Sequence, residues 1–339
     1  MSSFLFDILP VDTDVKLTIQ LACLLNEEGH EVCYTDSSDS SFTSYLLQKG
    51  MGRVLYPDDF RWFKPDLVLL DKRLENRICF YQDRNIRIVY LGLWFGNKQT
   101  VSKDFPLLFL APSPLDYHDQ SDGWLVCAGP LLDLENIGEK TLSKREELLA
   151  GRMSRYKKQS SKLSLFIVAE MAEDLDAGFH FYELVKEFCL QNTQYEIIVC
   201  SNSQEWLDRL FPLPINMQFY LSNASCQLTA SGDLLVTNGD LDMLVSCIYH
   251  SLPVLLLPVT KVQVENTARM VYHGLGLKMD DKCDTVNDFR NQIQTLLQHK
   301  EDIAIKMNRM SKLFDRKSEQ VHYVINWLEE LVNRKKLEI

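Results

Sequence analysis

The segment from Asp233 to Pro258 restricts the fold more than any other part of the chain. An apolar run, Leu234-Leu-Val-Thr237, leads into the turn Asn238-Gly-Asp240, then a helix-length apolar segment and a second apolar run, Val254–Leu257. Two short buried runs joined by a helix are typical of a β-α-β unit and therefore of a parallel sheet. The turn lies at the carboxyl edge of such a sheet, where ligands bind, and the backbone N–H groups of the helix start can hold a diphosphate.

Strand-like and helix-like segments alternate along the rest of the 339 residues as well. A charged segment without a clear apolar stripe, from about 131 to 162, separates two such alternations. We therefore expect an α/β protein with two Rossmann-like, doubly wound domains that face each other across a cleft. The expected domains are 1–150 and 160–310, followed by a C-terminal helix, 311–339, that returns to the first domain.

Composition excludes several classes of partner. The net charge of −11 argues against nucleic acid or an anionic membrane, because both require clustered Lys and Arg. No apolar segment is long enough to cross a membrane, and no signal peptide is evident. The nine cysteines show no metal-ligand spacing, and several stand in apolar segments (Cys23, Cys79, Cys189 and Cys247). This usage indicates reduced thiols in a hydrophobic core and hence a cytoplasmic protein.

Several motifs, in this order, resemble the UDP-glycosyltransferases of plants, animals and macrolide pathways, which have the GT-B fold. Pro10-Val-Asp-Thr-Asp14 and Gly29-His-Glu-Val32 stand where that family has Pro-x-x-Gly-His and Gly-His-x-Val. Lys64-Pro-Asp-Leu-Val-Leu-Leu-Asp71 is similar to the family's Pro-Asp-x-x-x-x-Asp strand, and Ala128-Gly-Pro130 to its Val-Gly-Pro. Asp233-Leu-Leu-Val-Thr237 is similar to its Asp-Leu-Phe-Ile-Thr.

The resemblance implies inverting transfer of a sugar from a nucleotide diphosphate sugar to a small, largely apolar acceptor. The family's catalytic base is a histidine, and the matching position here is Asp14, with Asp12 as the second candidate. A carboxylate, whose reference pKa is about 4, is a weaker base near neutral pH unless burial raises that pKa. Both aspartates also suit the start of a helix as caps. Trp94 and Phe95 are the expected lining of the acceptor pocket, with a place in the core as the alternative.

The donor-binding residues implied by the resemblance surround the glycine turn and the helix that follows the second strand. They are Asn238, Gly239, Asp240, Asp242, Ser246, Gln263, Asn266 and Glu170. Asp240 and Asp242 replace neutral residues of the family, and Ser246 replaces the glutamate that holds a ribose. Each carboxylate close to a diphosphate repels it by about 1 kcal/mol at surface dielectric. Mg²⁺ bridging these groups can reverse that sign, although no metal motif is present. Helix capping is the alternative role for Gln263 and Asn266.

These departures leave a second hypothesis open. A GT-B protein without catalysis can act as a partner or chaperone of an active, homologous glycosyltransferase, or as a module that binds a small ligand. The missing His, Asn-Ser and Glu favour it, as do the acidic Glu170, Asp240 and Asp242. A sugar-nucleotide epimerase on the same fold has less support, because it needs donor-site residues that are absent here. No cofactor beyond the nucleotide-sugar substrate is expected.

Overall fold

The computed structural model divides the chain into two compact units. Unit 1 comprises Met1–Asp133 and Leu313–Ile339, and unit 2 comprises Leu134–Lys312. The structure describes residues 1–9, 12–35, 46–47, 50–56, 58–93, 95, 105–116, 125–129, 162–169, 175–201, 203–221, 232–279, 285–315 and 318–334. The predicted domain boundary near residues 140–160 lies outside these ranges.

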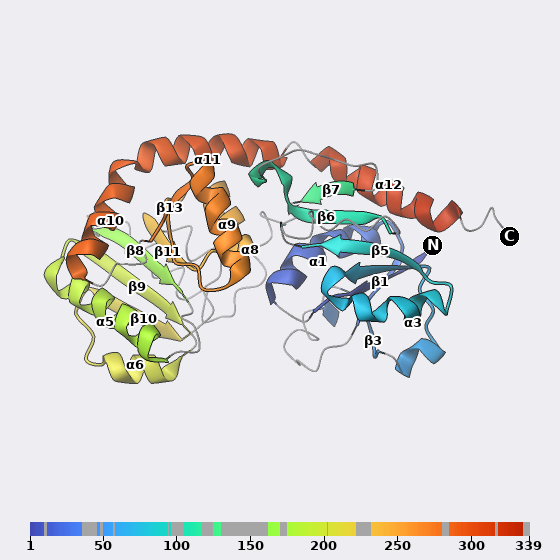
Figure 1. Ribbon diagram of the computed structural model, residues 1–339, viewed down its shortest axis with the longest axis horizontal. Coiled ribbons are helices and arrows are strands. Elements are labelled where there is room, and N and C mark those ends of the chain that lie inside the picture. The colour runs from blue at the N-terminus through green and yellow to red at the C-terminus, as the bar shows by residue number, and fades with distance from the viewer. Residues whose placement is uncertain are drawn as a thin grey trace. The chain divides into compact units, whose positions relative to one another are not determined.

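Unit 1 is built on a seven-stranded parallel sheet with the order β3-β2-β1-β4-β5-β6-β7 (Figure 1). Its strands are β1 (Ser3–Asp7), β2 (Glu31–Thr35), β3 (Gly52–Val54), β4 (Leu67–Asp71), β5 (Arg87–Gly92), β6 (Leu107–Pro112) and β7 (Leu125–Gly129). Residues Leu67–Leu70 of β4 are all fully buried. This burial explains why the strand is a continuous apolar run, since helices cover both faces of a parallel sheet.

The handedness of the crossovers in unit 1 determines on which face of the sheet each helix lies. Helix α1 (Asp12–Glu27) connects β1 to β2 in one direction, whereas α3 (Ile78–Gln82), preceded by the 3₁₀ segment η2 (Lys72–Arg77), connects β4 to β5 in the other. Because such crossovers are right-handed, the two helices lie on opposite faces of the sheet. The direction reverses between β1 and β4, which makes their carboxyl ends the switch point of this sheet.

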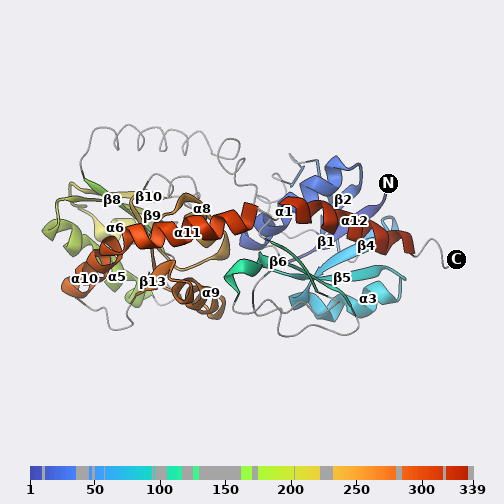
Figure 2. The ribbon, with the colours of Figure 1, turned by 90° about the horizontal axis from the view of Figure 1, so that it is seen from above.

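Unit 2 repeats the design with a six-stranded parallel sheet, β10-β9-β8-β11-β12-β13. Its strands are β8 (Leu163–Val168), β9 (Tyr195–Ser201), β10 (Met217–Leu221), β11 (Leu234–Thr237), β12 (Val254–Leu256) and β13 (Gly276–Lys278). Its helices are α5 (Leu175–Gln191), α6 (Gln204–Leu210), α8 (Leu241–His250), α9 (Lys261–Tyr272) and α10 (Val286–Gln298), followed by α11 (Lys300–Asp315). Helix α10 packs on α5 (Figure 2), where Phe289 meets Phe181 and Phe188. The switch point of this sheet lies between β8 and β11.

The predicted α/β class with two parallel, doubly wound sheets is confirmed. Asp12 and Asp14 lie in the first turn of α1, where acidic residues are favourable. One local prediction is wrong. Cys79 is exposed rather than in the core, whereas Cys189 and Cys247 are buried as predicted and Cys23 is partly buried. Among the described residues, no helix is both long and apolar enough to span a membrane.

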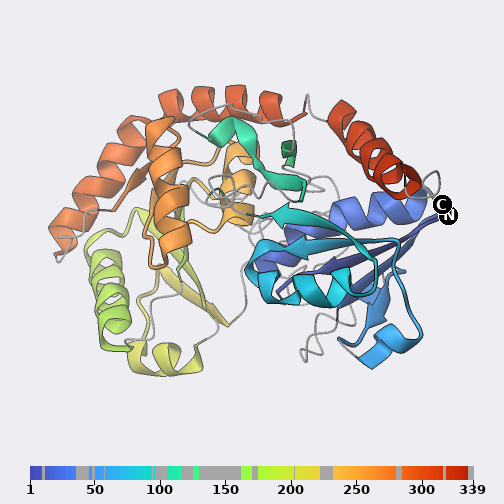
Figure 3. The same cartoon turned by 45° about the vertical axis from the view of Figure 1, so that its right-hand side comes forward.

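The last helix, α12 (Ser318–Arg334), packs within unit 1 against β7, so its predicted return to the first half of the chain is confirmed (Figure 3). His30 forms a polar link between this helix and the sheet. The Ser2 backbone N–H donates to His30 Nδ1 at 3.3 Å, so Nε2 carries the proton and donates to Glu329 Oε1 at 2.9 Å. The imidazole is buried and makes an edge contact with Phe4. These contacts give His30 a structural role.

We expect Glu329→Ala to lower the free energy of unfolding by about 1 kcal/mol, because the buried His30 N–H loses its acceptor. Asn326→Ala is the matched control, since Asn326 is an exposed residue of the same helix. Urea denaturation monitored by circular dichroism measures both variants. Equal stability of Glu329→Ala and the control would show that the His30 contact does not hold α12.

The buried thiols should resist modification in the native protein. Burial raises the pKa of Cys33 to about 11 and that of Cys189 and Cys200 to about 12, so almost no thiolate is present at pH 8. In a titration with an aromatic disulfide reagent at pH 8, Cys79 should react quickly and these three only after denaturation. Cys79→Ser should reduce the rapid phase by one equivalent, and an unchanged rapid phase would contradict the assignment.

Candidate functional site

The glycine turn predicted from the sequence lies at the switch point of unit 2. β11 ends at Thr237, which pairs with Val168 of β8, and α8 begins at Leu241. Gly239 has φ of +97°, a conformation that side chains disfavour, and a Cβ at this position would meet Thr267 Oγ1 at 3.1 Å. Glycine is therefore required by the backbone conformation and by the close approach of α9.

Two asparagine side chains hold this turn in place. Asn238 Nδ2 donates to the carbonyl of Leu257 at 2.8 Å, and Asn266 Nδ2 donates to the carbonyl of Gly239 at 3.0 Å. Both residues are almost fully buried, at 3% and 2% exposure. These two amide groups, which the sequence analysis assigned to donor binding, connect the turn after β11 to the end of β12 and to α9. The turn is therefore rigid.

Gln263 forms a bridge between the turn and the start of α9. Its side-chain oxygen accepts hydrogen bonds from the backbone N–H groups of Val259 and Thr260. Its backbone N–H donates to Thr260 Oγ1, which completes a capping box. Its Nε2 donates to Asp240 Oδ1 at 3.1 Å. The capping role considered for Gln263 is thus present, and the same amide also positions the Asp240 carboxylate.

The other predicted donor residues on α8 face inward. Asp242 is 7% exposed and accepts a hydrogen bond from the backbone N–H of Met243, and Ser246 is 2% exposed. Asn266 Oδ1 and Thr267 Oγ1 are buried without a hydrogen-bond partner among the described residues. Asp240 is the exposed carboxylate of this group and stands at the N-cap of α8 without capping it. Its negative charge occupies the position where the helix N-terminus favours an anion.

The structure describes only part of the predicted acceptor side. Asp12 and Asp14 lie in the first turn of α1, and their side chains fall outside the described part of the chain, as do Trp94 and Glu170. Phe95 is 2% exposed and packs on Phe109, with ring centroids 6.1 Å apart. Phe95 is therefore a core residue, which was the alternative to a place in the acceptor pocket.

A buried network at the carboxyl edge of unit 1 was not singled out from the sequence. Asp7, the last residue of β1, is fully buried and accepts hydrogen bonds from Tyr81 Oη, Thr35 Oγ1 and Arg77 Nη1. Burial raises the pKa of Asp7, and the bonds from Tyr81 and Arg77 oppose that rise. The Arg77 guanidinium also lies over the Tyr56 ring, 4.1 Å from its centroid.

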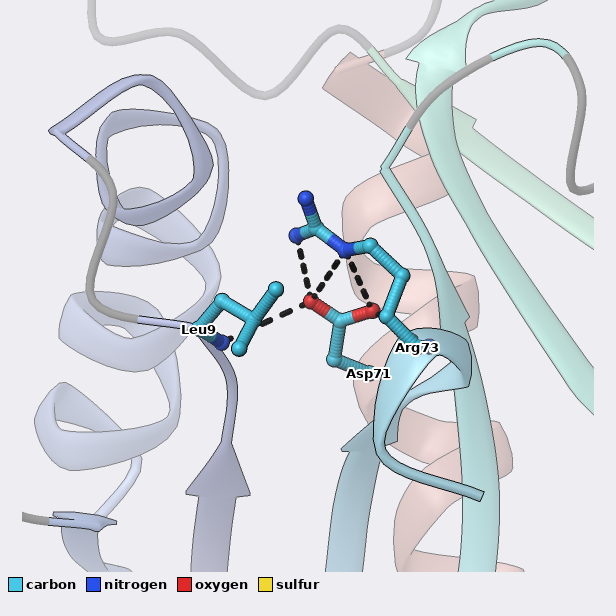
Figure 4. A network of polar contacts seen from close by, with 3 residues as sticks. All are labelled: Leu9, Asp71 and Arg73. Carbon is cyan, nitrogen blue, oxygen red and sulfur yellow. Dashed lines mark hydrogen bonds and ion pairs between the residues drawn. The ribbon is translucent and has the colours of Figure 1, made fainter. Parts of the chain in front are cut away.

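Asp71, the last residue of the neighbouring strand β4, forms a second cluster with Arg73 and Leu9 (Figure 4). Its carboxylate is 1% exposed and accepts from the Arg73 backbone N–H at 2.9 Å, from Arg73 Nε at 3.0 Å and from Nη2. It also lies 3.5 Å from the Leu9 backbone N–H. An acidic residue at a strand end followed two residues later by arginine was the available sequence signal for this pair.

Metal binding has no support in the described ranges. No group of three or more His, Cys, Asp or Glu side chains in them is arranged to hold an ion.

Comparison with solved structures identifies the fold. The kitacinnamycin glycotransferase matches with a TM-score of 0.77 at 14% identity, covering 98% of this chain and 99% of that one. UGT71G1 of Medicago truncatula, solved with UDP-glucose, matches with 0.74 at 11% identity, covering 98% of each chain. The spinosyn rhamnosyltransferase SpnG, solved with thymidine diphosphate, matches with 0.70 at 13% identity, covering 96% and 100%. No protein-family model and no curated protein matches the chain.

The chain therefore has the GT-B fold, the class of two-unit α/β protein to which these glycosyltransferases belong. The fold expected from the resemblance is confirmed along almost the entire length. At 11–14% identity in these three pairs, the likeness establishes the fold rather than an activity.

Gly239→Ala tests the geometry of the turn. We expect it to lower the free energy of unfolding by about 1–3 kcal/mol, because alanine is strained at this φ and its Cβ crowds Thr267. Gly29→Ala is the matched control, since Gly29 also has a positive φ, +85°, but a Cβ there meets nothing within 4 Å. Thermal or urea unfolding measures both. An equal loss in the two variants would mean that crowding against α9 contributes nothing.

Proposed function

We propose that this protein transfers a sugar from a nucleotide diphosphate sugar to a small, largely apolar acceptor. The observation that carries the proposal is the rigid turn at Gly239, which places the N-terminus of α8 at the switch point of unit 2 in a GT-B fold. Helix starts at switch points are sites for diphosphate groups. The bound UDP-glucose of UGT71G1 and the thymidine diphosphate of SpnG support a nucleotide sugar as donor.

In the proposed inverting reaction, a base removes the proton of the acceptor hydroxyl while its oxygen attacks the anomeric carbon. The bond from that carbon to the phosphate oxygen breaks, and the diphosphate leaves with the electron pair. Asp14, or failing it Asp12, is the proposed base. Backbone N–H groups near Asn238 and Gly239 are proposed to stabilise the charge on the leaving diphosphate.

The hydrogen bonds around the turn leave a second candidate function to be tested. The side-chain amides of Asn238, Gln263 and Asn266 are used inside the protein, and Asp240 adds a negative charge beside the helix start. A GT-B protein that binds a ligand or an active transferase without catalysing transfer is consistent with such a turn. Retained nucleotide binding without transfer to any acceptor would favour this candidate over the first.

Isothermal titration with UDP-, GDP- and dTDP-sugars, each with and without Mg²⁺, tests donor binding directly. At least one nucleotide sugar should bind with a saturable signal. Silence across the whole panel would contradict both the glycosyltransferase proposal and a retained nucleotide site.

Asp240→Asn should strengthen binding of the nucleoside diphosphate that binds best, by roughly threefold to tenfold. The substitution keeps the oxygen that Gln263 contacts and removes about 1 kcal/mol of repulsion with the phosphates. Asp208→Asn makes the same charge change on the surface of α6, where Asp208 accepts a bond from Gln204, and should leave the affinity unchanged. Equal affinity of Asp240→Asn and the unmodified protein would place the diphosphate away from this turn.

A further inference from the structure

Helix α11 runs along the outside of unit 2 and exposes one side over several turns (Figures 1 and 2). Its other side packs inward through Ile303, Met307 and Met310, which are 4%, 0% and 8% exposed. Ile305, by contrast, is 52% exposed. Because the buried side chains repeat every three or four positions, the exposed ones do so as well, and they form a continuous ridge along the helix.

This exposed row, the α11 ridge, carries opposite charges at its two ends. Its members are Glu301, Asp302, Ile305, Arg309 and Lys312, and all of them are exposed. Glu301, Ile305 and Arg309 follow one another at intervals of four residues, so their side chains lie in one line along the helix. The ridge therefore begins with an acidic turn, has an apolar centre and ends in basic turns.

The charges of the α11 ridge are not neutralised within the protein. Among the described residues, none of its four charged side chains takes part in an ion pair or a hydrogen bond. The other two cations of the helix lie beside the ridge. Lys300 pairs with Asp233 at 3.4 Å, and Lys306 Nζ lies against Gly274 at the end of α9, on the flank of the basic half. Asp315 ends the helix, and its side chain is outside the described part of the chain.

Such a ridge is complementary to a second copy of itself in the antiparallel orientation. A twofold axis through the centre brings the Ile305 side chains of the two copies together. Glu301, four residues before the centre, then lies opposite Arg309 of the second copy, four residues after it. Asp302 and Lys312 stand beside these pairs, so opposite charges are neighbours there too. Parallel pairing would instead place like charges opposite each other at both ends, which is unfavourable.

We propose that the α11 ridge is an interaction surface for a second copy of this chain, in an antiparallel, twofold-symmetric pair of helices. Charge complementarity argues for this occupant, because the ridge holds two acidic and two basic side chains on one face. An anionic lipid surface or an acidic partner would be repelled by the acidic turn, and a basic partner by the basic turns. The surface is independent of the proposed sugar transfer.

The dimer is expected to be weak. A single pair of helices covers less surface than the about 800 Å² per partner of a standard interface. Exposed ion pairs also contribute little individually, and salt screens them. Association should therefore depend both on protein concentration and on ionic strength.

Sedimentation velocity of the full chain over a wide range of protein concentration measures this association. A monomer–dimer equilibrium should appear at about 0.1 M salt, and the dissociation constant should rise about tenfold or more at about 1 M salt, because the screening length falls from about 10 Å to about 3 Å. Monomers at every concentration, or a dimer insensitive to salt, would overturn the proposal.

Charge reversal at either end of the ridge tests its orientation. Glu301→Lys/Asp302→Lys makes the ridge wholly basic, and Arg309→Glu/Lys312→Glu makes it wholly acidic. Each variant alone should be monomeric at about 0.1 M salt, because like charges then face each other. An equimolar mixture of the two should form a dimer with one copy of each, since opposite charges are restored across the interface. Recovery in the mixture also shows that both variants are folded.

The control makes the same net charge change elsewhere in unit 2. Glu183→Lys/Glu187→Lys alters two exposed positions of α5 and should dimerise like the unmodified protein. Dimers that persist in both ridge variants, or a mixture that stays monomeric, would overturn the proposal. Binding of a monomeric, unmodified protein to phosphatidylglycerol vesicles, lost in Arg309→Glu/Lys312→Glu, would assign the ridge to a lipid surface and also overturn it.

Discussion

The parallel pairing of one central pair of strands in each unit determines where the polar groups of that unit collect. β1 pairs with β4 and β8 pairs with β11, and in both sheets the chain proceeds outward in opposite directions from that pair. The loops that leave the two strands therefore diverge, and backbone and side-chain polar groups collect between them. The Gly239 turn and the Asp71–Arg73 pair occupy equivalent places in the two units for this reason.

The two switch points use their polar groups differently. In unit 2, buried amides such as Asn238 and Asn266 bond backbone carbonyls, so they make the turn rigid and leave the backbone N–H groups of α8 as the proposed anion contacts. In unit 1, a buried carboxylate holds an arginine that reaches solvent. The two asparagine amides therefore bond the backbone around a turn, whereas the Asp71 carboxylate bonds the side chain of Arg73.

Local patterns predicted the elements well where burial alone decides them. The run Leu67–Leu70 and the turn at Gly239 were both correctly interpreted, since a covered parallel strand must be apolar and a tight turn needs glycine. Cys79 was placed in the core because its neighbours in sequence are apolar, but it lies on the exposed side of α3. A five-residue helix is too short for its period to show which face is buried.

From the sequence alone, the alternation of strands and helices, the two-unit GT-B architecture and the glycine of the turn after β11 could all be determined, because each depends on patterns between residues close in the chain. Only the tertiary structure decided which polar groups meet. Gln263 reaches Asp240, His30 reaches Glu329 and Leu9 approaches Asp71 through contacts between distant segments. Such contacts depend on strand register and helix packing, and periodicity along a single chain carries no information about either.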